Sequence, residues 1–151
     1  MAIEWEMPAE EIEADILANG VDGRGVLTQH YGTTALNASL LLARSLRFLP
    51  PDDPRIRATV LAIADELVID DLVLRYRVDE TDDGFKGEEG TFTICLFWLV
   101  SALCEIGEHK RARELCAKSL SFAGPLGSMP KRSTRTGQQL GNFPRAFTHL
   151  R

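Results

Sequence analysis

The longest apolar run of the chain extends from Phe92 to Cys104 and contains no charged residue. Its large apolar side chains fall on every side of a helical wheel, which is typical of a helix that packs against neighbours all round. The run is shorter than the roughly 20 residues that a membrane-spanning helix requires. We therefore expect a central helix over 92–106, and we expect it to be the most buried helix of the fold.

A second apolar segment over 35–48 is also predicted to be helical, and a proline pair ends it. An amphipathic helix over 54–68 follows, with apolar positions at helical spacing and charged residues on the opposite side. The caps expected for these two helices are a threonine (Thr33 or Thr34) and an aspartate (Asp52 or Asp53). Together the two segments predict one helix hairpin.

The same pairing recurs when the central helix meets an amphipathic helix over 108–120, across Gly107. Long loops are expected over 69–90 and 122–140, with a short extended piece over 73–78 in the first of them. Residues 142–150 are predicted to start another apolar helix. Apolar inner helices, charged outer helices and long loops at one end are typical of an all-α fold, here part of an α/α toroid.

A separate helix is expected near the N-terminus, with Pro8 in its first turn and Asn19 and Gly20 at its end. Its predicted apolar stripe consists of Ile12, Ile16 and Leu17. The loop that follows over 20–32 is rich in glycine and ends in a polar and aromatic cluster that includes His30. Such a cluster can line a pocket, although a histidine there can equally be structural.

Composition narrows the function classes. The 151 residues fit one domain, and a net charge of −5 with a pI near 5.2 argues against a general nucleic-acid binder. The acidic N-terminal segment does not resemble a signal peptide, so we expect a cytoplasmic protein.

Three cysteines without metal-ligand spacing (Cys95, Cys104 and Cys116) are interpreted as small buried hydrophobes. No metal, cofactor or membrane partner is predicted.

Candidate chemistry lies at the start of the central helix, where Glu88 and Glu89 stand between two glycines. These carboxylates could simply favour the positive end of the helix dipole, or they could line a pocket at the mouth of the helix. Trp98 lies in the middle of the apolar run and is interpreted as a core residue rather than a platform for a sugar.

Four strings of the chain together resemble bacterial glycoside hydrolase family 15, the family of glucoamylases, glucodextranases and related trehalases. The strings cover residues 25–32 (GVLTQHYG), 74–77 (LRYR), 87–93 with 97–98 (GEEGTFT and FW) and 140–150 (LGNFPRAFTHL). The resemblance implies an (α/α)6 barrel of the six-hairpin glycosidase type. We expect residues 1–151 to be a single C-terminal fragment of the catalytic domain, a partial toroid of two helix hairpins plus the start of a further helix.

The resemblance also implies inverting hydrolysis of an α-glucosidic bond by a general acid and a general base, both carboxyl groups. The family's general acid falls before Met1. Relatives carry the general base in a string close to LYAEEIDPRTG, whereas residues 126–137 read LGSMPKRSTRTG. No catalytic residue is therefore expected in this chain, and we expect it to be inactive alone.

The basic loop at 128–135 has two readings. For one choice of codons for LYAEEIDP, loss of a single base yields Ser-Met-Pro-Lys-Arg-Ser-Thr, which is the sequence of residues 128–134. The other reading is an evolved basic patch for phosphate or nucleic acid, although the loop lacks the aromatic residues that usually accompany such patches.

The resemblance places Arg75 among the groups that bind sugar hydroxyls, and we expect a partial sugar site. Its expected substrate-binding residues are Arg75, Glu88, Glu89 and His30. Arg75 could instead pair with Asp79 or a glutamate as a loop clasp. An α-glucoside or a trehalose-type sugar is the expected partner of the whole family enzyme, with self-association through exposed apolar flanks also possible for this chain. The alternative is a non-catalytic helical module that binds a protein partner or a sugar.

Overall fold

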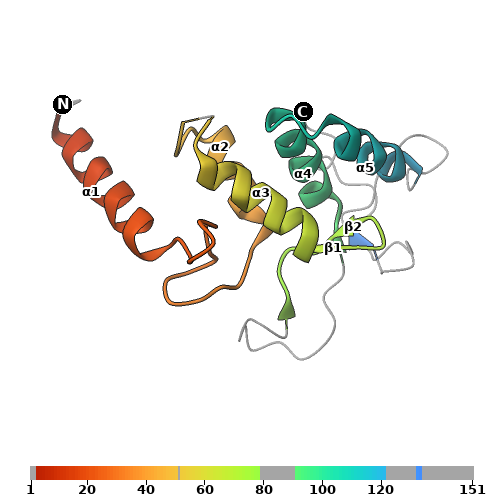
Figure 1. The fold of residues 1–151 in the computed structure, drawn as a ribbon, viewed down its shortest axis with the longest axis horizontal. Helices are drawn as coiled ribbons and strands as arrows, with labels where there is room; N and C mark the ends of the chain where they lie inside the picture. The colour runs from red at the N-terminus through yellow and green to blue at the C-terminus, as the bar shows by residue number, and fades with distance from the viewer. Residues whose placement is uncertain (1–2, 51, 79–90, 122–131, 134–151) are drawn as a thin grey trace.

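The computed structural model describes residues 3–50, 52–78, 91–121 and 132–133 (Figure 1). This part of the chain is mostly helical, so the all-α prediction is confirmed. The helices are α1 (Ile3–Asn19), the 3-10 helix η1 (Ala38–Leu41), α2 (Leu42–Ser45), α3 (Pro54–Glu66), α4 (Thr93–Glu105) and α5 (His109–Ser121). The strands form two short antiparallel pairs, β1 (Val68–Ile69) with β2 (Leu72–Val73) and β3 (Thr91–Phe92) with β4 (Arg132–Ser133).

Helix α4 lies at the centre of the core, as its apolar sequence predicts. It packs against α5, η1 and α3, and the side chains of Leu99 and Leu103 are 0% exposed. The expectation of burial on every side is wrong, because Ser101 and Cys104 are exposed and several apolar side chains are half-buried. The described neighbours cover only part of the helix surface. Trp98 is half-buried and packs against the core, as predicted.

Helix α3 begins as the sequence predicts. Asp53 is its N-cap, and the Asp53 carboxylate accepts a hydrogen bond of 2.9 Å from the backbone N–H of Arg55. The Arg55 guanidinium also pairs with this carboxylate, at 2.7 Å. Hydrogen bonds from Arg55 and its positive charge hold the pKa of Asp53 below the ordinary 3.8. The cap is therefore ionised at neutral pH.

Replacing Asp53 with alanine should lower the free energy of unfolding by about 0.5–2 kcal/mol at neutral pH, the usual cost of losing such a cap. Because the folded state depresses the pKa, this contribution is complete above pH 3.8 and is lost as the pH falls through the lower folded value. Urea unfolding of both proteins across this pH range would measure the difference. The neighbouring exposed carboxylate gives a control, because Asp52→Ala should change stability by less than about 0.5 kcal/mol.

The helix predicted over 35–48 is shorter than expected and starts later. Asn37, rather than Thr33 or Thr34, is the N-cap of η1, and its side chain accepts from the Ser39 N–H. Residues 35–37 are held extended because Asn37 forms an isolated bridge with Tyr76, and the Ala38 N–H donates to the Arg75 carbonyl at 2.7 Å. The tertiary partner outweighs the local helix preference of this apolar segment.

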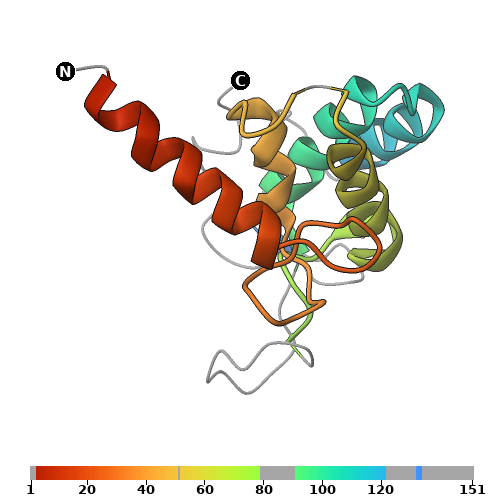
Figure 2. The same cartoon turned by 60° about the vertical axis from the view of Figure 1, so that its left-hand side comes forward.

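Helix α1 begins at Ile3, so Pro8 lies inside the helix rather than in its first turn. The predicted end is correct, because the Gly20 N–H donates to the Ile16 carbonyl at 2.7 Å. Ile12 was expected in an apolar stripe but is 60% exposed, and Ile16 and Leu17 are only half-buried. Figures 1 and 2 both show α1 extending away from the other helices, which accounts for the exposure.

Other buried positions were also predicted incorrectly. Of the three cysteines, Cys95 is buried, Cys104 is exposed and Cys116 is half-buried, so only one is a core residue. The apolar positions Ala112, Leu115 and Leu120 of α5 are expected to face inward, and the first two are buried, but Leu120 is 62% exposed and Ser119 is buried in its place. The described neighbours of α5 therefore contact a face shifted by one residue near its C-terminal end.

The first residues of the predicted loop 69–90 form a hairpin instead. Strands β1 and β2 are joined by Asp70 and Asp71, whose φ angles are 51° and 62°. Two consecutive left-handed residues are typical of the tight turns that match strand twist. The extended piece predicted over 73–78 is partly confirmed, since β2 includes Val73 and Tyr76 forms a bridge. The rest of that loop, and the helix expected over 142–150, lie outside the described residues.

Candidate functional site

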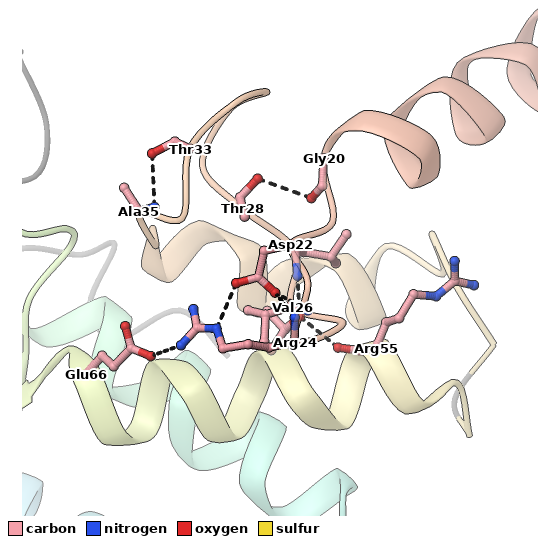
Figure 3. Close-up of polar contacts among 11 residues, drawn as sticks. Gly20, Asp22, Arg24, Val26, Thr28, Thr33, Ala35, Arg55 and Glu66 are labelled. Carbon is pink, nitrogen blue, oxygen red and sulfur yellow. Dashed lines mark hydrogen bonds and ion pairs between the residues drawn. The ribbon is translucent and has the colours of Figure 1, made fainter.

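The loop over 20–32 is closed by its own hydrogen bonds (Figure 3). The Asp22 carboxylate accepts from the backbone N–H groups of Arg24 and Val26, at 2.9 and 3.0 Å. The Arg24 guanidinium contacts the same carboxylate at 2.8 Å. Burial raises the pKa of Asp22, but these hydrogen bonds outweigh it and the pKa is lowered. The carboxylate is therefore ionised at neutral pH and holds the turn together.

The same loop is attached to helix α3 at two points. Near the middle of α3, the Thr59 hydroxyl accepts from the Leu27 N–H at 2.9 Å in a buried contact. At the end of α3, the Arg24 guanidinium lies 2.6 Å from the Glu66 carboxylate (Figure 3). The loop is thus fixed against the helical body although it has little regular structure of its own.

His30 lies at the exposed tip of this loop. Its Nδ1 is 2.9 Å from the Tyr31 carbonyl, and the Thr28 hydroxyl donates to the His30 carbonyl at 3.0 Å. The neighbouring Tyr31 hydroxyl donates to Asp15 of α1 at 2.7 Å. The histidine ring is therefore accessible and oriented by a local contact. Both a pocket-lining role and a structural role agree with this position.

Arg75 lies in the extended segment that follows β2. It is exposed, whereas Leu74 and Tyr76 on either side are buried at 9% and 8% exposure. Its guanidinium carbon is 5.1 Å from the centre of the Tyr76 ring, a cation–π distance. Among the residues that the structure describes, no hydrogen bond or ion pair occupies this guanidinium. Asp79, its alternative clasp partner, lies outside the described residues.

Backbone hydrogen bonds bring the His30 loop and the Arg75 segment to the same short stretch of chain, residues 35–38. On one side the Gln29 N–H donates to the Ala35 carbonyl at 2.9 Å. On the other side the Ala38 N–H donates to the Arg75 carbonyl at 2.7 Å. Two of the predicted site residues therefore belong to one connected group of loops, although they are 45 positions apart in sequence numbering.

Glu88 and Glu89 lie outside the described residues. The nearest described element after them is β3, which contacts β2 and pairs with β4, with Thr91 opposite Ser133 and Phe92 opposite Arg132. Two residues of the basic stretch 128–135, Arg132 and Ser133, are therefore paired with the strand directly before α4.

Three residues that organise this region escaped the sequence reasoning: Arg24, Glu66 and Arg77. The Arg77 guanidinium donates from Nε and Nη2 to the Glu66 carbonyl, at 3.1 and 2.9 Å. The Asp22-Gly23 pair is a turn signal that could have indicated the closed loop. The long-range contacts of the arginines have no comparable signal, because they join residues 11 or 42 positions apart.

Within the described ranges, no group of three or more potential metal-ligating side chains is found. Over the same residues, none of the helices combines the length and apolarity that crossing a membrane would require.

The fold corresponds to part of a glycosidase of the helical-toroid type. A solved structure named "Glycosidase Wild Type" superposes on it with a TM-score of 0.71 at 26% identity, covering 83% of this chain and 33% of that one. A glycosidase variant in complex with glucose superposes equally well, with the same TM-score and coverage. The family model described as "Glycosyl hydrolases family 15" matches residues 2–122. The chain belongs to this family.

The curated relatives are named trehalases. The chain is 70% identical to that of Mycolicibacterium smegmatis and 67% identical to that of Mycobacterium tuberculosis, in each case over 99% of this chain and 22% of the relative. It is 35% identical to the trehalase of Thermoplasma volcanium, over 97% of this chain and 24% of the relative. The chain thus spans about a fifth to a quarter of these relatives' length. Its resemblance to family 15 and the partial-toroid prediction are confirmed, and a non-catalytic module is not favoured.

Proposed function

We propose that this chain is part of a trehalase-type hydrolase of carbohydrate metabolism, which cleaves an α-glucosidic bond with inversion and takes an α-glucoside such as trehalose. The observation that carries the proposal is its 70% identity to a trehalase over 99% of its own length. Because the chain spans only 22% of that relative, we propose that it supplies part of the sugar site and does not catalyse hydrolysis alone.

Within this partial site, Arg75 is proposed as the main sugar contact. A guanidinium offers several N–H donors in one plane, which suits neighbouring sugar hydroxyls. Arg75 is exposed and its ring contact with Tyr76 leaves those donors accessible. We propose His30, Glu88 and Glu89 as further substrate-binding residues. This assignment for the two glutamates rests on their position before β3 in the sequence.

Binding of trehalose and glucose to the full chain, measured by calorimetry or NMR titration, tests this proposal. Arg75→Ala should weaken binding about tenfold or more, since a charge-assisted hydrogen bond commonly contributes that much. Arg75→Lys keeps the charge but not the planar fork, and should restore only part of the affinity. Arg113→Ala, which removes an exposed arginine on α5, is the matched control and should bind as the wild type does. Binding that is absent, or unaffected by Arg75→Ala, would contradict the proposal.

We also propose that the chain self-associates through exposed apolar side chains. Leu46 and Leu120 are 76% and 62% exposed, respectively, and each forgoes roughly 1.5–3 kcal/mol of possible burial. Sedimentation velocity over a range of concentrations should therefore show species larger than a monomer. Replacing both leucines with serine should shift the distribution towards monomer. A concentration-independent monomer for the unaltered chain would refute this expectation.

We also propose that the protein is cytoplasmic. It agrees with the three cysteines being free, because disulfides are uncommon in reducing compartments.

A further inference from the structure

Three arginines from three separate segments contact the last turn of α3. Arg24 reaches the Glu66 carboxylate from the loop 20–32 (Figure 3). Arg77 donates twice to the Glu66 carbonyl from the segment that carries Arg75. Arg111 of α5 donates to the Ala64 carbonyl at 2.5 Å and pairs with Asp65 at 2.8 Å. The last carbonyls of a helix are its negative end and lack partners within the helix, so guanidinium groups stabilise them.

The contacts of Arg77 fix the backbone around Arg75. Two positions after Arg75, the Arg77 side chain is bound to the carbonyl of Glu66. One position before it, the Leu74 N–H donates to the Leu67 carbonyl at 2.9 Å. The segment is therefore attached on both sides of Arg75 to two consecutive residues at the end of α3, while the Arg75 side chain itself faces solvent.

We propose that the end of α3 is a shared anchor that holds the two candidate sugar-binding segments in register, with Arg77 as the main positioning residue for Arg75. The consequence for sugar affinity rests on the proposed function. Arg77 does not itself contact sugar in this proposal; it restricts the backbone that presents the Arg75 guanidinium. Preorganising a binding group in this way improves affinity by reducing the entropy lost on binding.

Arg24 and Arg77, which attach the two candidate sugar-binding segments to the anchor, should differ in effect. The Arg24–Glu66 pair is half-exposed, with 50% and 36% of the side chains accessible, and exposed pairs contribute little. The loop that carries Arg24 is also held by the buried contact with Thr59. The Arg77 contact is partly buried and places two donors on one carbonyl. Removal of Arg77 should therefore loosen its segment much more than removal of Arg24 loosens the loop.

Amide hydrogen exchange of the full chain, followed by NMR, tests the anchor without any ligand. The reporters are the amides of Ala38 and Leu74, which bond to the Arg75 carbonyl and to the Leu67 carbonyl. The amides of Leu99 and Leu103 in α4 report global stability. Arg77→Met should raise exchange at the reporters about tenfold or more, and Arg77→Lys by less, because lysine can replace only one of the two hydrogen bonds. The α4 amides should change less than about twofold.

Arg57, which lies in α3, provides a matched control for Arg77. Arg57 makes the same kind of contact as Arg77, donating to the Ile106 carbonyl at 2.7 Å and to Glu108 at 2.5 Å, but at the turn after α4. Arg57→Met should leave the exchange rates of the Ala38 and Leu74 amides unchanged. The anchor proposal would be wrong if Arg77→Met left the exchange rates of the Ala38 and Leu74 amides unchanged. It would also be wrong if exchange of the α4 amides increased equally.

Trehalose titration of the same variants tests the consequence for the site. Arg77→Met should weaken binding about threefold or more while Arg57→Met does not, if a preorganised Arg75 segment contributes to affinity. Equal affinity of Arg77→Met and wild type would overturn the positioning role. If the wild type itself binds no trehalose, the proposed function fails, and the exchange measurements alone decide whether the anchor exists.

Discussion

The 151-residue chain should release no glucose from trehalose, maltose, isomaltose or dextrin above background. An inverting glycosidase needs one carboxyl group to protonate the leaving oxygen and another to activate water, and each such group commonly contributes about 10²–10⁴ in rate. The family resemblance assigns neither group to this chain. The resemblance implies that the family's pair of glutamates is replaced across Pro130, Lys131 and Arg132.

Restoring the loop gives this expectation a sharper test. Replacing residues 128–134 with LYAEEIDP should not produce activity in the chain alone, because the resemblance places the general acid outside this chain. The restored loop should increase glucose release only when the remainder of a family 15 barrel is supplied, either in the same polypeptide or by co-expression. Glucose release would be measured by a coupled assay, with the Mycolicibacterium smegmatis trehalase as the positive control. Glucose release by the purified, unaltered chain would show that the site assignment is wrong.

Leu103→Ala should lower the free energy of unfolding by about 2–5 kcal/mol, the usual range for a large buried side chain cut back to alanine. The Leu103 side chain is 0% exposed and lies in α4, which packs against α5, α3 and η1. Such a loss is a large part of the roughly 5–15 kcal/mol that stabilises an ordinary domain. Urea unfolding at low protein concentration, read by circular dichroism, measures it.

The control for this substitution is the same change at an exposed position. Leu46 is 76% exposed, so Leu46→Ala removes little buried surface and should cost less than about 0.5 kcal/mol. Similar losses for the two variants would mean that α4 is not the centre of a cooperative core.

The elements with strong local signals were predicted well from the sequence. Helix α4 follows from an uncharged apolar run, and α3 follows from an aspartate cap, an adjoining proline and helical spacing of its apolar residues. The segment over 35–48 had the same apolar character, yet its first residues are extended. The decisive contact there is with Tyr76, which lies 39 positions away from Asn37 and leaves no trace in a local pattern.

In the candidate site, too, residues with a sequence signal were predicted, and residues that act through long-range contacts were not. Arg75 and His30 were predicted from family strings, and the structure places both on neighbouring loops. The residues that hold those loops in place are Arg24, Glu66 and Arg77, which lie on three different segments. Their side chains are charged and two of them lie in ordinary surface patterns, so only the folded arrangement reveals that they share a partner.

The projecting position of α1 has a consequence for the cooperativity of folding. Among the described residues, its contacts with the rest of the chain include the Tyr31–Asp15 hydrogen bond and the packing of Leu17 near its C-terminal end, whereas α4 packs against α5, α3 and η1. A helix so attached can unfold without disturbing the rest, since local opening requires only the loss of local contacts. We therefore expect α1 to open and close independently of the core, so that the described part of the chain unfolds as two energetic units.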